Sequence, residues 1–257
     1  MLEMTDIVKT FNPGTVNENR FFRKFSLKID TGSFVSVVGS NGSGKTTILN
    51  LICGSTELDG GKIIMNGKDI TNERDYIRQR RIGRVFQNPA FGTCPDMTIL
   101  ENLALAANKG GKYNLKRCVS DKDRDRFKSM LSPLGLGLED KLDVRVGSLS
   151  GGQRQTLALI MSTMTPIDFL ILDEHTAALD PKTAETVMQL TGKIVEEKKL
   201  TTVMVTHNLR YALEYGDRIL MMHNGRIILD KSGEEKKNLK LDEVLHMFDE
   251  ISVEAGN

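Results

Sequence analysis

Apolar positions along the chain follow two different patterns. Residues 33–38, 169–172 and 202–205 are short, predominantly apolar runs, which is typical of strands buried on both faces. Residues 46–53 and the segment after Asp180 instead have the length and side-chain spacing of helices. Buried strands that alternate with helices predict an α/β core.

Hairpin signals predict a second kind of sheet. Residues 2–11 and 21–30 alternate apolar and polar side chains, and the Asn12-Pro13-Gly14 sequence suits a turn between them. Asn66-Gly67 and Asn224-Gly225 each follow a short apolar strand and favour a hairpin turn with two positive φ angles. These segments predict antiparallel hairpins in addition to the strands of the core.

Capping residues indicate where several helices begin and end. Thr98 and Ser150 each precede an apolar helical stretch, and Asp180-Pro181 joins an N-cap residue to a proline at the first helical position. Gly54 can end the helix over 46–53 in a left-handed conformation. The pattern is helical from about residue 89 to 165, so we expect a helical subdomain inserted in the α/β core.

The chain is therefore predicted to be one domain with several parts. The expected parts are the α/β core with its β subdomain (1–88 and 166–230), the helical subdomain (89–165) and a C-terminal tail (231–257). Within them we expect a polar, glycine-containing stretch at 109–116 and a helix near 241–248 that frays towards the terminus.

Composition excludes several classes of protein. Of the 257 residues, 39% are apolar and the formal net charge is +1, so no overall charge favours nucleic acid. Cys53, Cys94 and Cys118 are widely spaced, which argues against a disulfide framework and a zinc site and suits a reducing compartment. The N-terminus lacks the layout of a signal peptide, and no apolar run approaches the ~18 residues that cross a bilayer.

A glycine-rich loop carries the clearest chemical signal. The segment 39–46 fits the phosphate-binding pattern G-x-x-x-x-G-K-[ST] and lies between a predicted strand and a predicted helix. Its glycines let successive backbone N–H groups point inward, and the helix start adds partial positive charge, so a polyphosphate fits. The loop and the residue after it are Gly39, Ser40, Asn41, Gly42, Ser43, Gly44, Lys45, Thr46 and Thr47.

Phosphoryl transfer needs positioned phosphates, a metal and a placed water. Lys45 can reach the β- and γ-phosphates, and the Thr46 hydroxyl can hold Mg²⁺. Asp173 follows an apolar strand, so we expect it at the carboxyl edge of the sheet, where it can support the magnesium shell. Its neighbour Glu174 is the candidate to polarise the attacking water.

A second possible anion site begins at Ser150. The Ser150-Gly151-Gly152 sequence combines a hydroxyl, unobstructed backbone N–H groups and a helix start. Two interpretations remain open at this point. The glycine pair is a plain helix cap, or it binds the nucleotide of another subunit.

The order of these motifs resembles that of the ATP-binding cassette ATPases. The phosphate loop, Gln87, the Leu-Ser-Gly-Gly-Gln string at 149–153, the Asp173-Glu174 pair and His207 occur in the order of that family, over essentially the whole chain. The resemblance implies a P-loop NTPase core, with a RecA-like mixed sheet and flanking helices, an antiparallel β subdomain and an inserted α-helical subdomain. It also implies that two such domains pack head to tail around two ATP molecules.

The same resemblance implies roles for individual residues. Phe11 would stack on adenine, although the family often has Tyr there and a plain core phenylalanine is the alternative. Gln87 would complete the Mg²⁺ shell of Thr46 and Asp173, and His207 would contact the γ-phosphate opposite Glu174. The residues implied to lie at the partner's nucleotide are Ser150, Gly151, Gly152, Gln153 and Asp180. His175 stands where many members have proline, and no role is assigned to it.

The function that the resemblance implies is ATP hydrolysis coupled to transmembrane transport. We expect an ATPase subunit that dimerises with itself on ATP and drives solute import through a separate permease at the cytoplasmic face of a bacterial membrane. A solute-binding protein would be a further partner, and similarity to cassettes of amino-acid uptake systems favours an amino acid. The alternative is a soluble cassette ATPase not coupled to transport, although neither a long coiled-coil insert nor a second cassette is present. An Asn-Lys-x-Asp guanine motif is also absent, which argues against a GTPase.

Overall fold

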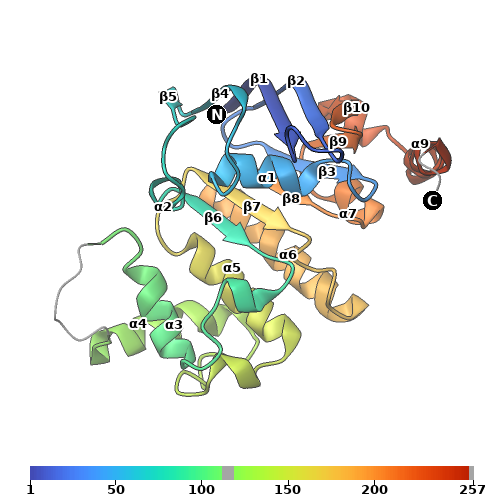
Figure 1. Cartoon of the computed structure of the whole chain (residues 1–257). Helices are drawn as coiled ribbons and strands as arrows, with labels where there is room; N and C mark the ends of the chain where they lie inside the picture. Colours follow the sequence, from blue (N-terminus) through green and yellow to red (C-terminus); the bar gives the residue numbers. More distant parts are fainter. Residues whose placement is uncertain (112–118, 255–257) are drawn as a thin grey trace.

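The computed structural model describes residues 1–111 and 119–254, with the backbone alone for Asp121 and for residues 249–254. Cys118 and most of the polar stretch predicted at 109–116 lie outside these residues. The described strands form two sheets (Figure 1). One is four-stranded in the order β2-β1-β4-β5 and the other six-stranded in the order β10-β9-β3-β8-β7-β6.

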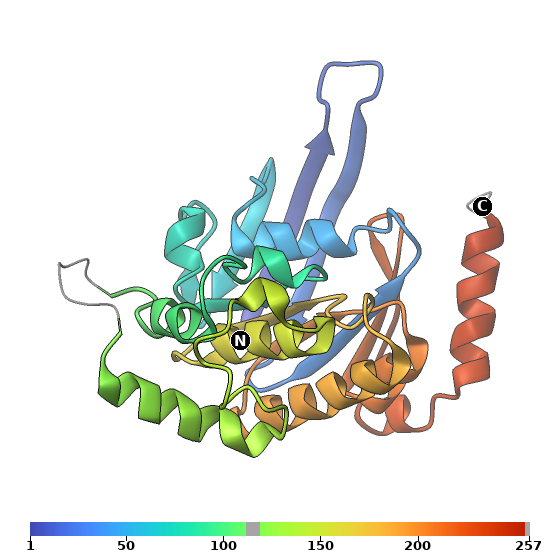
Figure 2. The same ribbon diagram turned by 90° about the horizontal axis from the view of Figure 1, so that it is seen from below.

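The smaller sheet is antiparallel throughout and corresponds to the predicted β subdomain. Its strands are β1 (Leu2–Phe11), β2 (Asn19–Ile29), β4 (Gly60–Met65) and β5 (Lys68–Asp69). The turn between β4 and β5 has positive φ at both Asn66 and Gly67, as predicted from their sequence. Figure 2 shows the far end of the β1–β2 hairpin projecting from the body of the molecule.

The larger sheet is mixed, because parallel strands β9, β3, β8, β7 and β6 are joined by an antiparallel strand, β10. Its strands are β3 (Phe34–Gly39), β6 (Ile82–Val85), β7 (Phe169–Asp173), β8 (Thr202–Val205), β9 (Arg218–His223) and β10 (Arg226–Ser232). Leu170 and Leu172 of β7 pack on one face of the sheet, and Phe169 and Ile171 pack on the other. The strand is thus buried on both faces, as its continuous apolar run predicts.

Helices cover both faces of the large sheet. Helix α1 (Lys45–Cys53) packs in the core that the two sheets share (Figure 1), and Gly54 ends it with φ of 79°, as expected. The opposite face is covered by α6 (Pro181–Lys198) and by the helical block. That block contains η1 (Pro89–Phe91), α3 (Ile99–Ala107), α4 (Asp121–Leu131), η2 (Ser132–Leu134), η3 (Val146–Ser148) and α5 (Gly151–Thr163).

The predicted helix caps are confirmed. Thr98 and Ser150 each accept a hydrogen bond from the backbone N–H three residues on and form capping boxes. Asp180 caps α6 by accepting a hydrogen bond from Thr183 N. Sequence patterns missed the short helices α2 (Asp75–Arg78), α7 (Leu209–Glu214) and α8 (Gly233–Lys237), which are too short to show a clear apolar period. The predicted C-terminal helix, α9, runs over Leu241–Glu254.

Candidate functional site: a split nucleotide site

The phosphate loop connects β3 to α1 and is shaped by close backbone contacts. Gly39, Gly42 and Gly44 have φ of 150°, 75° and 107°. A Cβ atom on Gly39 would lie 2.3 Å from the carbonyl oxygen of Met222, and one on Gly44 would lie 2.6 Å from the Phe21 ring. Only glycine fits these two positions, because backbone angle and space both exclude a side chain.

Lys45 is folded into its own loop. Its side chain is buried, and Nζ donates hydrogen bonds to the carbonyl oxygens of Gly39 at 2.7 Å and Ser40 at 2.9 Å. Burial lowers the pKa of Lys45, and the charges of Glu174 and Asp173 oppose that shift. An ammonium group held this close to the loop is positioned for a phosphate ligand.

Two further features of the loop fit a polyphosphate. The hydroxyl oxygen of Ser43 is buried and has no hydrogen-bond partner among the described residues. Thr46 is exposed at the start of α1, where the unpaired N–H groups of the helix favour an anion. The residues present therefore fit the triphosphate of ATP.

The carboxyl ends of β7 and β8 bring the predicted catalytic side chains together. Asp173 ends β7, and the next residue, Glu174, has φ of 49°, a strained value for a residue with a side chain. The backbone N–H of Glu174 is held by Val205 O at 2.9 Å. Just after β8, His207 Nε2 lies 2.8 Å from Glu174 Oε1. The two residues predicted to act on the same phosphate are thus in direct contact.

His175 is a buried structural residue on the other side of the same loop. Its Nε2 lies 3.1 Å from Thr191 Oγ1, and the Thr191 hydroxyl donates to Val187 O at 2.8 Å. The Thr191 hydroxyl proton is already used in the bond to Val187 O. His175 must therefore carry its proton on Nε2 and donate it to Thr191 Oγ1. Burial lowers the pKa of His175 to about 4. The imidazole is therefore a neutral link between the loop after β7 and helix α6.

Arg84 was not found by sequence reasoning, yet it contacts the predicted metal-supporting residue. From β6, its Nη2 donates to Asp173 Oδ2 at 2.7 Å and its Nη1 donates to Asn50 Oδ1 at 2.9 Å. The guanidinium carbon lies 4.6 Å from the centre of the Phe86 ring. A single arginine in a strand has no local signal, because its partners are distant in the sequence.

The donor atoms near the loop suit a hard cation that phosphate oxygens and water complete. Thr46 supplies a hydroxyl and Asp173 a carboxylate, both of which are oxygen ligands of the kind that Mg²⁺ prefers. Over residues 1–111 and 119–254, no group of three or more His, Cys, Asp or Glu side chains could hold a metal by itself. A cation at this place would therefore depend on the nucleotide for part of its shell.

The remaining predicted residues form a separate group, which we call the signature cluster (Ser150, Gly151, Gly152, Gln153 and Asp180). Helices α5 and α6 start side by side, as two close approaches show. A Cβ on Gly151 would lie 3.2 Å from the Leu179 side chain, and one on Gly152 would lie 2.1 Å from Thr183 Cγ2. Ser150 and Asp180 are exposed at these helix starts. In the described parts of the chain, no hydrogen bond or ion pair joins this cluster to the phosphate loop.

Gln87 and Phe11 lie near the ends of two strands, β6 and β1. Gln87 is exposed in the loop after β6, and the preceding carbonyl, Phe86 O, accepts a hydrogen bond from Gln155 of α5 at 2.9 Å. The loop is therefore tied to the helical block. Phe11, at the end of β1, contacts the Phe21 ring edge to face at 6.1 Å, and Phe21 packs on Gly44. Phe21 extends the aromatic surface beside the loop and was missed by the motif.

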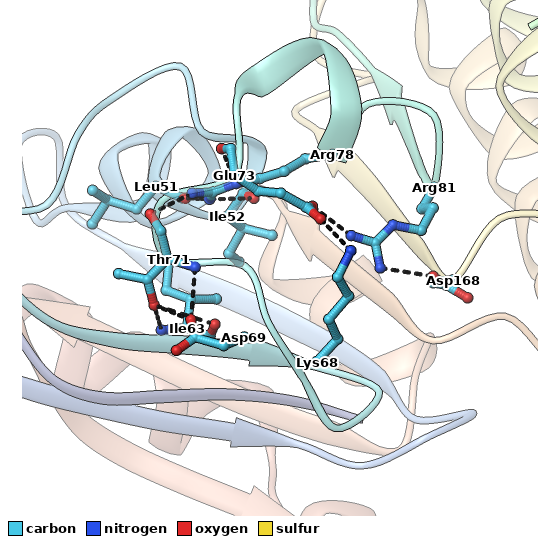
Figure 3. A network of polar contacts seen from close by, with 10 residues as sticks. All are labelled: Leu51, Ile52, Ile63, Lys68, Asp69, Thr71, Glu73, Arg78, Arg81 and Asp168. Atoms are coloured by element: carbon cyan, nitrogen blue, oxygen red, sulfur yellow. Dashed lines mark hydrogen bonds and ion pairs between the residues drawn. The ribbon is translucent and has the colours of Figure 1, made fainter. Parts of the chain in front are cut away.

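A buried arginine supports α1 from its far end (Figure 3). Arg78 Nη1 donates to Leu51 O at 2.8 Å and Ile52 O at 3.2 Å, and its Nη2 donates to Thr71 O at 2.8 Å. Leu51 and Ile52 lie in the last turn of α1, where carbonyl groups lack the usual helical partner four residues on, so the guanidinium adds hydrogen bonds to them. The phosphate-loop helix is thereby fixed at both ends.

The chain is also similar to known proteins. Residues 22–177 match the model of the ABC transporter family. The chain belongs to the ATP-binding cassette family. It is 48% identical over 249 residues, 97% of this chain and 99% of the relative, to the tyrosine transport ATP-binding protein of Clostridioides difficile (strain R20291). A phosphonates import ATP-binding protein of Lactococcus lactis subsp. cremoris (strain SK11) is 30% identical to this chain. The aligned part is 95% of this chain and 98% of that protein.

A solved dimeric ATP-binding cassette, in a post-hydrolysis state bound to ADP and Pi, superimposes with a TM-score of 0.76. Its sequence is 30% identical, and the aligned part is 90% of this chain and 98% of the solved chain. The cassette described here is accordingly an ATP-binding ATPase subunit of an ABC transporter. Along 1–111 and 119–254, no helix has both the length and the apolar character to cross a membrane.

Proposed function

We propose that this cassette drives solute import, and that two copies of it pack head to tail with ATP between them. The observation that carries the proposal is the division of the predicted nucleotide residues into two clusters within one chain. The phosphate loop, Asp173, Glu174 and His207 form one cluster, and the signature cluster forms the other on the exposed starts of α5 and α6. A second copy can place its signature cluster over the first copy's phosphates.

Each residue then has a defined task. Lys45 and the loop N–H groups bind the β- and γ-phosphates, and Thr46, Asp173 and Gln87 would hold Mg²⁺, which neutralises charge on the phosphate oxygens when bound. Glu174 accepts a proton from the attacking water. His207, already 2.8 Å from Glu174, orients that carboxylate and contacts the γ-phosphate.

The membrane partner we propose is a separate permease that docks on the helical block beside residues 88–97. Phe91, in η1, is three-quarters exposed at this place. This segment follows Gln87, and Gln155 of α5 donates a hydrogen bond to Phe86 O just before Gln87, so a change at the nucleotide can reach the docking surface. The subunit would act at the cytoplasmic face of a bacterial membrane together with a solute-binding protein. The Clostridioides relative supports an amino acid, and an aromatic one in particular, as the solute.

Glu174→Gln tests the catalytic assignment. The amide keeps the size of the side chain but cannot accept the water proton, so we expect phosphate release to fall by ~10²-fold or more while ATP binding persists. ATP-loaded dimers should accumulate on size-exclusion chromatography. Glu196→Gln, an exposed position on α6, is the matched control. Phosphate release near the unmodified rate would remove Glu174 from its proposed role.

The solute is tested through the membrane partner. The permease is copurified with the tagged cassette, reconstituted with its binding protein, and screened with individual amino acids for stimulated ATP hydrolysis. Stimulation by aromatic amino acids supports the proposed solute class. Stimulation only by another class of solute would overturn it while leaving the ATPase assignment intact.

A further inference from the structure

The Asp173 carboxylate is paired with a cationic side chain. Arg84 Nη2 lies 2.7 Å from Asp173 Oδ2, and the side chains of both residues are largely buried, at 16% and 14% exposed. A charged pair with so little solvent around it interacts more strongly than a surface pair. The contact engages Oδ2 and so fixes the direction of the carboxylate.

Arg84 is itself held from several sides. Asn50, one turn along α1 from the phosphate loop, accepts from its Nη1 at 2.9 Å, and the Phe86 ring packs on the guanidinium at 4.6 Å. Ser162 of α5 donates to the Arg84 backbone carbonyl at 3.0 Å. Asn50 belongs to α1, Arg84 to β6 and Asp173 to β7, so the guanidinium is placed by the same elements that place Lys45 and Asp173.

The charge balance of the site gives this arrangement a consequence. Lys45 and Arg84 supply two positive charges, and Asp173 and Glu174 supply two negative charges. Without Arg84 the site would carry an unpaired carboxylate beside the phosphates, which repels free ATP and attracts a divalent cation. A positive charge attracts free ATP, with four negative charges, more strongly than its magnesium complex, with two.

We propose that Arg84 is a positioning residue that orients and partly neutralises Asp173, and thereby sets how strongly nucleotide binding depends on Mg²⁺. The proposal rests on the proposed function, in which Asp173 supports the metal. Arg84 acts through Asp173 and through its charge, and it takes no part in bond making or breaking. A merely structural arginine would stabilise the fold but leave the preference for the magnesium complex unchanged.

The test is calorimetric titration of the full chain with a non-hydrolysable ATP analogue, once with EDTA and once with excess Mg²⁺. The readout is the dissociation constant measured in EDTA divided by the dissociation constant measured in excess Mg²⁺. In Arg84→Met we expect this ratio to rise by about tenfold, because loss of the positive charge weakens binding of the metal-free ligand most. Arg84→Lys keeps the positive charge that sets this ratio and should stay within about threefold of the unmodified chain.

Two controls separate charge from folding. Asn50→Ala removes a contact of Arg84 but keeps its charge, so the ratio should not rise. Arg81→Met removes an arginine just before β6 that pairs with Glu73 at 2.5 Å and with Asp168 at 3.9 Å, outside the site, so it too should leave the ratio unchanged.

The outcomes distinguish this inference from the proposed function. An unchanged ratio in Arg84→Met would overturn the role of Arg84, as would an equal rise in Arg84→Lys or Arg81→Met. If Mg²⁺ strengthened binding in neither the unmodified chain nor any of the variants, the proposed metal site would itself be wrong. Should Arg84→Met fail to fold, Arg84→Gln provides a second neutral variant for the same comparison.

Discussion

At the scale of single residues, the acidic side chains at the end of β7 each have a partner of their own. Glu174 contacts His207, and Asp173 contacts Arg84. The adjacent carboxylates are therefore directed towards different basic groups, which reduces repulsion between them and fixes their orientations. His175 then anchors the loop to α6 through Thr191. The consecutive residues Asp173, Glu174 and His175 thus have different roles, and each role is determined by the side chain that the residue contacts.

The buried His175 predicts a pH dependence of stability. Its pKa is about 4 in the folded chain and 6.5 ordinarily, so the unfolded chain binds the extra proton first as pH falls. The contribution is fully present above pH 6.5 and is lost between pH 6.5 and about 4. Relative to His175→Asn, the unmodified chain should lose about 1 kcal/mol of unfolding free energy per pH unit over this window.

Urea unfolding of both chains at intervals from pH 7 to 4.5 measures this difference. Titration of all other groups is shared by the two chains and cancels in the comparison. Parallel stability curves would contradict the neutral, buried state assigned to His175.

At the scale of elements, the starts of α5 and α6 pack unusually close together. Gly152 permits this, since a Cβ at that position would overlap Thr183 Cγ2 at 2.1 Å. The close approach brings together the helix starts that carry the exposed Ser150 and Asp180. The spacing of the signature cluster is therefore a packing property of two helices, whereas each cap is local.

Gly152→Ala tests this packing. The added methyl group should displace Thr183 and lower the free energy of unfolding by about 1–3 kcal/mol, despite the better helix propensity of alanine. Thr183→Ser removes the overlapping Cγ2 atom, so the double variant should regain most of the loss. Chemical denaturation of the single and double variants provides the measurement, and a Gly152→Ala chain as stable as the unmodified one would refute the steric argument.

At the scale of the whole molecule, the phosphate loop and the signature cluster belong to one chain but do not contact each other through hydrogen bonds or ion pairs in the described residues. Under the proposed function a symmetric pair of chains completes two sites at once, because each contributes both surfaces. ATP bound at Lys45 would then join the chains, and its hydrolysis would release them.

Mixing two inactive variants tests whether the site is shared. In Lys45→Ala both sites of a dimer lack the phosphate-binding amine, and in Ser150→Arg both have an obstructed signature cluster. A mixed dimer has one site with both defects and one intact site, so ATP hydrolysis should reappear on mixing. Differently tagged chains verify that mixed dimers form. Mixed dimers without any recovered hydrolysis would show that each chain completes its own site.

Much of this molecule could be predicted from local sequence. The phosphate loop needs glycine where the backbone takes positive φ, the caps need Ser, Thr or Asp at helix starts, and Asn-Gly sets the hairpins. These demands act over a few consecutive residues, so Lys45 and Thr46 follow from the loop pattern and Ser150 and Asp180 from the cap pattern. Asp173 and Glu174 follow from the apolar strand before them. The family resemblance added Gln87, His207 and Phe11, whose positions alone carry little signal.

Only the tertiary structure decided how these residues meet. Arg84 reaches Asp173 across 89 positions of sequence, and His207 reaches Glu174 because β7 and β8 are neighbours in the sheet. Phe21, Arg78 and the Thr191 partner of His175 are likewise determined by packing between elements. The sequence by itself determined the chemistry available to the chain, because that depends on residue type and local backbone. The structure decided which charges pair, because pairing depends on contacts between segments far apart in the sequence.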